Sequence, residues 1–455
     1  MKRTLICLLS LALILAAFSG CARKESDYRA DKELAAGPAV TLTLVGQTPS
    51  FKPMEDVIAA FSRLYPNCTI EYEYLQDYDE SLLTRLQNND SVDLFMTNNI
   101  TADSPRRPYA LELLGQSDRL SLADTYEGLR RNFTFSENGA DALYAVPTGG
   151  EVRGLYVNTT LLSSLGLAVP ENYAGLLDCC AALKAAGYIP LQGNPGTFGQ
   201  MLMYPYVCSL IANADDRQAI YDRVNRCDAG VSELFRAPMS RLYELVADGY
   251  YNYKYVENTY QAFTDGKNET AARSFLNIVD ANGTAVKKDD VGQVAFMPGT
   301  MSFKSELDQM RGDYHSAIDY RFILAPVGDA GGYAYLSPAT GIAVNRGSAN
   351  TAWALEFLNY FFSRDVNRGF AAAQNIIPNT ADALRTITDT FRIDDSRVCQ
   401  LGEVTFDYVF YDVVKPVLTD VSKANNPKYM QSDGSMYGLE HYMAALEDGF
   451  AAQRK

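Results

Sequence analysis

The strongest constraint on the fold of this chain is a repeated alternation of strand-like and helix-like segments that begins at Val40. Residues 41–45 alternate polar and apolar side chains like a half-buried strand, and a Gly-Gln-Thr-Pro turn follows. From Met54 to Leu64 the apolar residues recur at helical spacing, and Pro66 prevents the helix from continuing. Short strands that alternate with single helices are typical of a sheet flanked by helices. The sequence therefore predicts an α/β fold.

Two strand-like segments later in the chain follow one another without a helix between them. They are residues 143–147 and 154–158, joined through a Gly-Gly pair. Such a pair predicts that the chain leaves one domain and enters another near residues 147–152, and a length of 455 residues is consistent with two domains. Prolines after later strand-like segments predict further crossings near residues 322–326 and 376–379.

The N-terminal residues have the pattern of an export signal. Met1-Lys2-Arg3 precedes an apolar run that is shorter than the roughly 20 residues needed to cross a bilayer. We therefore expect residues 1–20 to be a signal peptide. Phe18-Ser19-Gly20-Cys21 resembles the lipobox of bacterial lipoproteins, which implies lipidation of Cys21 and cleavage before it. An ordinary signal peptide with a chance cysteine is the alternative. Residues 21–39 are expected to form a flexible tether.

The charge of the chain argues against a nucleic-acid partner. Removal of residues 1–20 takes away Lys2 and Arg3 from the 40 basic side chains and no acids from the 55, so 38 remain against 55, a formal charge of −17. Such a surface repels nucleic acid and anionic lipid. No later window reaches a membrane-spanning length, and we expect the protein beyond residue 39 to be soluble, held at the membrane only through its lipid.

Cysteine and histidine usage predicts neither a cofactor nor a metal site. Six cysteines follow Cys21, widely spaced, and the spacing assigns no disulfide pairs. Cys180 falls on the apolar face of a helix predicted for residues 173–186 and is expected to be a core residue. The two histidines, His315 and His441, are far apart and lack the spacing of zinc ligands.

Several blocks of sequence, in their order along the chain, resemble those of the extracellular solute-binding proteins typified by bacterial maltose- and oligosaccharide-binding proteins. The blocks are Ala60-Phe61-Ser62-Arg63-Leu64-Tyr65-Pro66; Leu143-Tyr144-Ala145-Val146-Pro147 with Gly154-Leu155-Tyr156-Val157-Asn158; Gly187-Tyr188-Ile189-Pro190-Leu191; Gly292-Gln293-Val294-Ala295-Phe296-Met297; and Gly341-Ile342-Ala343-Val344. No block is diagnostic alone, but their order and spacing behind a lipobox are specific.

The resemblance implies a periplasmic-binding-protein-like fold of type II, with a hinge between two discontinuous lobes. It places residues 40–147 plus 326–376 in lobe one and residues 151–322 plus 379–455 in lobe two. A ligand held between the lobes would favour their closure, and the transmembrane subunits of an ABC permease would recognise the loaded protein.

Ligands of open α/β sheets bind beyond the carboxyl ends of the strands, which selects candidates in lobe one. Gln47 and Thr48 follow the first strand, and Asn98 and Asn99 follow the third. Uncharged polar side chains there can bind hydroxyl groups, although loop Asn and Thr can also cap the helices that follow. By resemblance, Glu151 matches an acidic residue of sugar-binding members; a solvated hinge carboxylate is the alternative.

Lobe two supplies further candidates through the resemblance. In the family, the segment that corresponds to residues 194–204 lies over the ligand. The Met-Pro-Gly-Thr loop at residues 297–300 stands where relatives often carry a stacking tryptophan, which this chain lacks there. An aromatic pair at residues 410 and 411 stands where relatives place a second aromatic pair in the cleft. Core packing is the alternative for the aromatic residues. These candidates are Asn194, Thr197, Phe198, Tyr204, Thr300, Phe410 and Tyr411.

The predicted ligand is a carbohydrate, most simply an oligosaccharide, and the predicted protein is not an enzyme. The single tryptophan, Trp353, opens a predicted helix and is expected to pack, so tyrosines would have to supply the stacking surfaces. A peptide, a polyamine or another polar metabolite is an alternative ligand for the same fold. A secreted glycoside hydrolase is the alternative enzyme, but the sequence has no G-x-S-x-G, H-E-x-x-H or phosphate-binding glycine loop.

Overall fold

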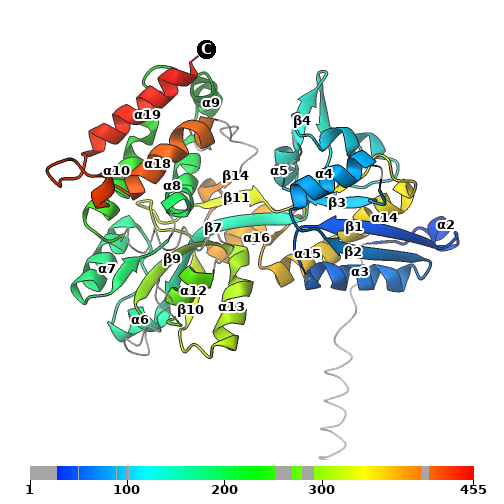
Figure 1. Cartoon of the computed structure of the whole chain (residues 1–455), viewed down its shortest axis with the longest axis horizontal. Helices are drawn as coiled ribbons and strands as arrows, with labels where there is room; N and C mark the ends of the chain where they lie inside the picture. The colour runs from blue at the N-terminus through cyan, green and yellow to red at the C-terminus, as the bar shows by residue number, and fades with distance from the viewer. Residues whose placement is uncertain are drawn as a thin grey trace, which may run out of the picture.

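The computed structural model describes residues 28–49, 51–88, 90–98, 100, 103–193, 195–212, 214–251, 269–278, 292–400 and 409–454. Within these ranges the side chains of residues 132, 195–198, 200–202, 269–271, 400, 410 and 411 are not described. The described chain forms two lobes that lie side by side, each built from a β-sheet and covering helices (Figure 1). The α/β, two-lobed fold predicted from the sequence is confirmed. Across these ranges no helix has the length and apolarity needed to span a bilayer.

The first lobe contains a five-stranded sheet in the order β2-β1-β3-β12-β6. Strand β1 pairs in parallel with β2 and β3, and β12 runs antiparallel to both β3 and β6. The strands are β1 (Val40–Gly46), β2 (Cys68–Tyr74), β3 (Leu94–Thr97), β6 (Val146–Pro147) and β12 (Gly341–Val344). Strand β12 lies between β3 and β6 in this sheet, although it comes from a point late in the sequence.

The longer helices of this lobe bury their apolar faces against this sheet. Helix α3 starts with a proline in its first turn and buries Met54, Val57, Ile58 and Phe61, as its spacing predicts. A separate hairpin, β4 (Thr134–Glu137) and β5 (Ala140–Leu143), turns through two residues with positive φ. The helices are α2 (Lys32–Ala35), α3 (Lys52–Leu64), α4 (Tyr78–Asn88), η1 (Arg107–Tyr109), η2 (Leu114–Gln116), α5 (Glu127–Arg130), η3 (Arg131–Phe133), α14 (Thr351–Phe361) and α15 (Arg364–Gln374).

The second lobe contains a larger sheet in the order β14-β11-β7-β9-β8, in which β10 and β13 also pair with β7. Strand β7 is the longest, and it pairs antiparallel with β9, β10, β11 and β13. The strands are β7 (Gly149–Asn158), β8 (Ile189–Leu191), β9 (Val294–Thr300), β10 (Tyr320–Ile323), β11 (Ala334–Pro338), β13 (Ile377–Pro378) and β14 (Val398–Gln400).

Helices form most of the remainder of the second lobe. Helix α7 starts at the Asn172 cap, whose side chain accepts from the Gly175 N–H (2.9 Å), and it is followed by Gly187 with φ of 81°. The helices are α6 (Thr159–Ser164), α7 (Tyr173–Ala185), α8 (Pro195–Ala212), α9 (Arg217–Asn225), η4 (Val231–Phe235), α10 (Arg236–Ala247), α12 (Glu269–Phe275), η5 (Met301–Phe303), α13 (Lys304–Asp313), α16 (Ala383–Phe391), η6 (Asp395–Arg397), η8 (Phe410–Val414), α18 (Lys415–Ser422), η9 (Pro427–Tyr429) and α19 (Leu439–Gln453).

The chain passes between the two sheets at three places that lie beside one another. Strand β6 leads into β7, β11 leads into β12, and α15 leads into β13. The Ala339 N–H donates to the Gly149 carbonyl (2.8 Å), and the Thr148 N–H donates to the Thr340 carbonyl (2.9 Å). Ile377 pairs with Gly150. The three passages are therefore joined laterally by backbone hydrogen bonds.

Two fully buried asparagines add to this junction. The Asn367 amide donates to the Thr148 carbonyl (2.9 Å) and its oxygen accepts from the Asn379 N–H (2.7 Å). The Asn379 amide donates to the Pro147 carbonyl (2.7 Å), and its oxygen accepts from the Tyr126 N–H (2.9 Å). Side chains therefore satisfy backbone groups that neither sheet pairs at this point.

Two segments differ from the division expected from the sequence. Strand β11 belongs to the second sheet, and Ala325, Val327 and Tyr335 pack in that lobe's largest apolar cluster, although residues 326–376 were assigned to lobe one. Residues 28–39 of the expected flexible tether are described, and they include helix α2. Strand β11 lies in the second sheet because it pairs with β7 and β14, which are distant from it in the sequence.

All six cysteines beyond Cys21 are buried, and no disulfide joins any of them in the described chain. Cys180 lies fully buried in α7, which confirms the core position that its helical spacing predicts. Burial raises the pKa of the Cys68 thiol to about 12 and that of Cys179 to about 11. Thiols of this kind behave as small apolar side chains and stay protonated.

Candidate functional site

The first group of candidate side chains lies at the carboxyl ends of β1 and β3. These strands are parallel neighbours, with Val45 paired to Phe95, so the residues that follow them meet at one edge of the sheet. The Gln47 amide donates to the Asn98 side-chain oxygen (3.3 Å). Asn98 is exposed and Gln47 half-buried. Each side chain keeps hydrogen-bonding capacity beyond this mutual bond.

This edge of the first sheet is next to the junction between the lobes. Gly341 of β12 pairs with Thr97 on one side and with Pro147 on the other. Thr97 is therefore two strand spacings, about 10 Å, from Pro147. Asn98 follows Thr97 directly, so it lies close to the point where the chain enters β7.

The second group of side chains lies at the start of β7 and at the end of β9. The half-buried Glu151 carboxylate accepts from the Ser302 N–H (3.0 Å) in η5. The Thr300 and Ser302 hydroxyl oxygens lie 3.1 Å apart, and Thr300 pairs with Arg153 across the two strands. The structure therefore brings together Glu151 and Thr300, two residues selected from the sequence.

Three residues of this group were not selected from the sequence: Arg153, Ser302 and Ser337. The Arg153 guanidinium donates to the Ser337 hydroxyl (2.7 Å) and lies over the Tyr335 ring (5.8 Å to its centre). Glu151 and Arg153 are half-buried, whereas Val152 between them is fully buried. That two-residue alternation is visible in the sequence and could have identified Arg153. No local signal identifies Ser302 or Ser337, because their partners are distant in the chain.

Burial makes the Glu151 carboxylate harder to ionise. Burial raises the pKa of Glu151 above the usual range of a glutamate, while hydrogen bonds from Ser302 and the charge of Arg153 act in the opposite direction. Burial likewise raises the pKa of Tyr156, whose hydroxyl donates to the Thr300 carbonyl (2.7 Å). The site therefore offers a carboxyl group with a raised pKa, a guanidinium and several hydroxyl groups within a small area.

The other selected residues have varied positions. Thr48 is exposed, and its carbonyl accepts from the Tyr72 hydroxyl (2.8 Å). Tyr204 is buried, packed edge-on against Tyr335 with ring centres 4.4 Å apart and hydroxyl groups 3.0 Å apart. Asn99 and Asn194 lie outside the described residues. Four others lie in helices α8 and η8 but have side chains that are not described: Thr197, Phe198, Phe410 and Tyr411.

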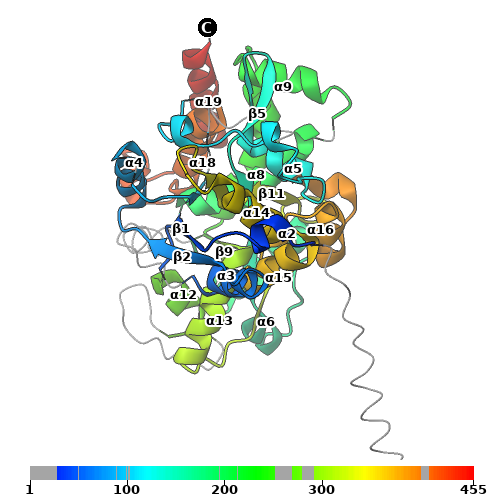
Figure 2. The ribbon, with the colours of Figure 1, turned by 90° about the vertical axis from the view of Figure 1, so that its right-hand side faces the viewer.

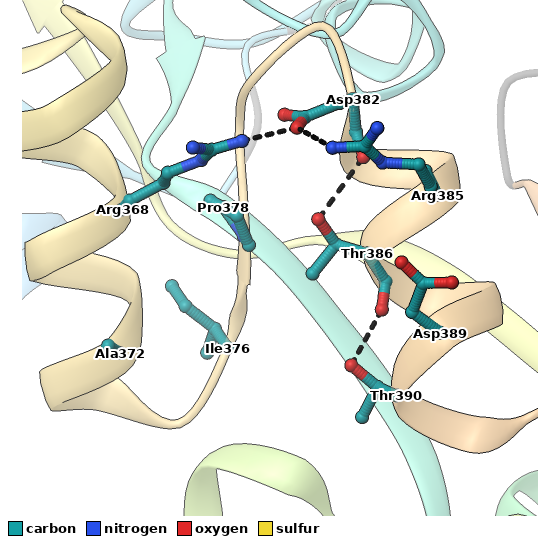
Figure 3. A pocket seen from close by; sticks show the side chains of 9 residues that line it. All are labelled: Arg368, Ala372, Ile376, Pro378, Asp382, Arg385, Thr386, Asp389 and Thr390. Atoms are coloured by element: carbon teal, nitrogen blue, oxygen red, sulfur yellow. Dashed lines mark hydrogen bonds and ion pairs between the residues drawn. The ribbon is translucent and has the colours of Figure 1, made fainter.

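A hollow of about 380 Å³ lies beside the junction, between α15, β13 and α16 (Figure 3). Asp382 forms ion pairs with Arg368 and, at 3.3 Å, with Arg385, so two positive charges offset its negative charge. Helix α15 packs in the first lobe's apolar cluster and α16 in a cluster with Val152 of β7. None of the residues selected from the sequence lines this hollow, and its ion pair links elements of the two lobes.

The described residues include no group of three or more His, Cys, Asp or Glu side chains placed to hold a metal ion. The polar groups at the two strand ends are instead amides, hydroxyls, one guanidinium and one carboxylate. Such a set can recognise a ligand by hydrogen bonds from two sides.

Comparison with known proteins identifies the fold and the family. A structure of the GacH receptor of Streptomyces glaucescens, studied unliganded and with acarbose, superposes with a TM-score of 0.61 at 15% identity, covering 92% of this chain and 99% of that one. The sugar-binding protein MalE of Xanthomonas citri gives 0.61 at 15% identity, covering 91% and 98%. The binding protein RafE in complex with raffinose gives 0.57 at 14% identity, covering 92% and 100%.

A search of curated proteins found no match. The family model described as bacterial extracellular solute-binding protein matches residues 46–368. The match covers most of the chain, and the solved structures share its two-lobed fold. The resemblance stated from the sequence is therefore confirmed: this chain belongs to the bacterial extracellular solute-binding protein family.

Proposed function

We propose that this protein is the lipid-anchored, extracytoplasmic solute-binding component of an ABC importer, and that it binds a carbohydrate between its lobes. Its family consists of solute-binding proteins, and three structures of the same fold are described as binding acarbose, sugar or raffinose. The loaded protein delivers its ligand to the permease without chemical turnover. Acylation of Cys21 holds it at the outer face of the cell membrane.

The observation that carries this proposal is the position of the two polar groups on either side of the lobe junction. Gln47 and Asn98 project from strand ends of the first sheet, and Glu151, Arg153 and Thr300 lie on the second. A ligand that contacts both groups stabilises the arrangement in which the lobes approach each other. A sugar fits these amides, hydroxyls and charged groups because each of its hydroxyls can donate and accept a hydrogen bond.

We also propose lobe boundaries based on the sheet pairing. Lobe one comprises residues 40–147 plus 341–376, and lobe two comprises residues 149–338 plus 377–454. This proposal keeps the first and third crossings predicted from the sequence, at 147–152 and 376–379. The second passage is placed after β11 because that strand pairs with β7 and β14.

A ligand screen tests the proposed function. Residues 22–455 are heated with neutral saccharides, amino acids, peptides or polyamines, and unfolding is followed by fluorescence. A ligand at 100 times its dissociation constant is expected to raise the free energy of unfolding by about 2.7 kcal/mol. We expect neutral saccharides to give this shift. A shift with polyamines, peptides or amino acids alone would refute the carbohydrate assignment.

Substitution of Asn98 tests the site. Loss of one hydrogen bond costs about 1 kcal/mol, so Asn98→Ala should weaken binding of the identified ligand about fivefold in calorimetry. Gln218→Ala, at an exposed position on α9, is the matched control and should bind like wild type. Unchanged affinity of Asn98→Ala would exclude this strand end from the site.

Metabolic labelling tests the anchor. Cells that express the full chain are supplied with a clickable fatty acid, and we expect the label on wild type and none on Cys21→Ala. Equal labelling of the two chains would disprove acylation at Cys21.

A further inference from the structure

The residues just before β1 are attached to the first lobe by a side-chain network. The Tyr28 hydroxyl donates to the Glu356 carboxylate of α14 and lies 2.7 Å from the Tyr65 hydroxyl, which also donates to Glu356. The Tyr28 ring packs edge-on against Tyr360, with centres 5.1 Å apart. Figure 2 looks onto this end of the first lobe and shows α2 beside α14 and α15.

Backbone groups of the same segment are bound as well. The Asp31 N–H donates to the Tyr65 hydroxyl (2.6 Å) and to Glu356 (3.2 Å), while the Asp31 side chain caps α2. The Asn67 amide donates to the carbonyls of Leu34 (2.9 Å) and Gly37 (3.1 Å). Residues 28–37, the docked segment, are therefore fixed at several points along their length.

The buried carboxylate explains why this attachment is favourable. Glu356 is 7% exposed, in a helix whose residues from 353 to 358 are all buried. A buried carboxylate is costly unless hydrogen bonds satisfy it, and the docked segment supplies bonds from Tyr28 and Asp31. Burial and the bond to Glu356 raise the pKa of Tyr28, so its hydroxyl keeps the proton that it donates.

The docked segment shortens the free chain between Cys21 and the fold. Seven residue steps separate Cys21 from Tyr28, a reach of about 25 Å when fully extended. If the chain were free up to β1, the nineteen steps from Cys21 to Val40 would reach about 65 Å. Docking therefore limits how far the attached end of the first lobe can move from Cys21.

The charge near this attachment is balanced, unlike that of the whole protein. Residues 22–37 carry four basic and four acidic side chains: Arg23, Lys24, Arg29, Lys32, Glu25, Asp27, Asp31 and Glu33. The mature chain from Cys21 has a formal charge of −17, so all of its net charge lies beyond residue 37. An anionic lipid surface consequently repels this segment less than it repels the remainder of the protein.

We propose that the docked segment orients the protein on the membrane, placing the α2 and α14 end of the first lobe beside the lipid bilayer that holds Cys21. The proposal rests on the acylation of Cys21 proposed above. Helix α2 lies at the end of the first lobe farthest from the second lobe (Figure 1). The second lobe, which has no short connection to the anchor, is then held farther from the bilayer.

Energy transfer to labelled lipid tests this orientation. The full acylated chain is reconstituted into vesicles of phosphatidylcholine and phosphatidylglycerol that contain an acceptor on a headgroup. A donor is attached through Leu64→Cys, beside Tyr65, or through Tyr429→Cys on the second lobe; both positions are exposed, and the native cysteines beyond Cys21 are buried. We expect stronger transfer from position 64 than from position 429.

Three variants of the donor-labelled chains, one of them a control, test whether the docked segment causes this orientation. Tyr28→Ala releases the docked segment and should abolish the difference between the two positions, whereas Arg29→Ala, at the exposed neighbouring residue, should retain it. Insertion of about twelve Gly and Ser residues before Tyr28 leaves the docking contacts intact but extends the reach to about 65 Å, and should also abolish the difference. Hydrogen exchange on residues 22–455 should show residues 28–37 protected in wild type and in Arg29→Ala, but not in Tyr28→Ala.

The possible outcomes distinguish a failure of the proposed orientation from a failure of the proposed acylation of Cys21. A wild-type chain without fatty acid would overturn both proposals. An acylated chain with equal transfer from positions 64 and 429 would overturn the orientation alone, as would an unchanged difference in both Tyr28→Ala and the insertion variant. Rapid hydrogen exchange of residues 28–37 in wild type would show that the segment is not docked, irrespective of acylation.

Discussion

At the scale of single residues, Glu151 is a group of the proposed site whose ionisation depends on the fold around it. Its carboxyl group binds a proton more tightly in the folded chain than in the unfolded chain, because burial raises its pKa. The contribution of Glu151 to the free energy of unfolding should therefore fall as pH rises from the ordinary carboxyl range through the folded pKa. This slope has the opposite sign to that of a carboxylate stabilised by an ion pair.

Glu151→Gln should remove this contribution, because glutamine has a similar shape and no charge. We expect the melting temperature of the variant, relative to wild type, to increase as pH rises from about 4 to about 7. Glu71→Gln, an exposed position on β2, serves as the control. Calorimetric scans across this range are the measurement, and a difference independent of pH would contradict the prediction.

Sequence patterns can place two residues together when each directly follows a strand and the two strands are neighbours in the sheet. Gln47 and Asn98 meet because they follow parallel neighbours, as the rule for strand ends predicts. Ser302 cannot be found in this way, because its bond to Glu151 joins residues 151 positions apart. The burial of Tyr204 likewise depends on Tyr335, which is brought against it by the second sheet.

At the scale of elements, the buried amides of Asn367 and Asn379 hold the lobe junction together. Asn379→Ala would leave the Pro147 carbonyl and the Tyr126 N–H without these partners. Buried backbone groups that lose a partner cost about 1–3 kcal/mol each, so for these two groups we expect a loss of about 2–6 kcal/mol in the free energy of unfolding. Urea denaturation measures this change.

Gln309→Ala on α13 provides the matched control for that substitution. Its side chain is exposed, and surface substitutions of this kind change stability by less than about 0.5 kcal/mol. If the two variants were equally stable, the junction amides would have no structural role. An Asn379→Ala chain that loses stability but binds ligand normally would assign these amides to stability alone.

Elements with a clear local period were predictable, and elements defined by distant pairing were not. Helix α3 and the strands on either side of it follow from apolar spacing and flanking prolines. Strand β11 was expected in the other lobe because Pro326 suggested a crossing, whereas its partners β7 and β14 lie far away in the sequence. Helix α2 is short, and its position depends on the buried Glu356 rather than on helix propensity.

At the scale of the whole molecule, the three passages between the sheets provide the hinge for the proposed closure. A ligand that contacts both lobes should reduce the radius of gyration measured by small-angle X-ray scattering. The Asn98→Ala chain should show the same compaction only at higher ligand concentration, because the substitution weakens binding and leaves the hinge intact. Scattering that does not change at saturating ligand would contradict closure.

The pairing of β12 between β3 and β6 also sets the order in which the first sheet can be completed during synthesis. Gly341 pairs with Thr97, so 244 residues must be added after β3 before its partner exists. At about 5–20 residues per second, the ribosome needs roughly 12 to 50 s to make that stretch. During this time the inner edge of β3 lacks its partner strand, and a chain that terminates early, before residue 341, leaves that edge open to aggregation.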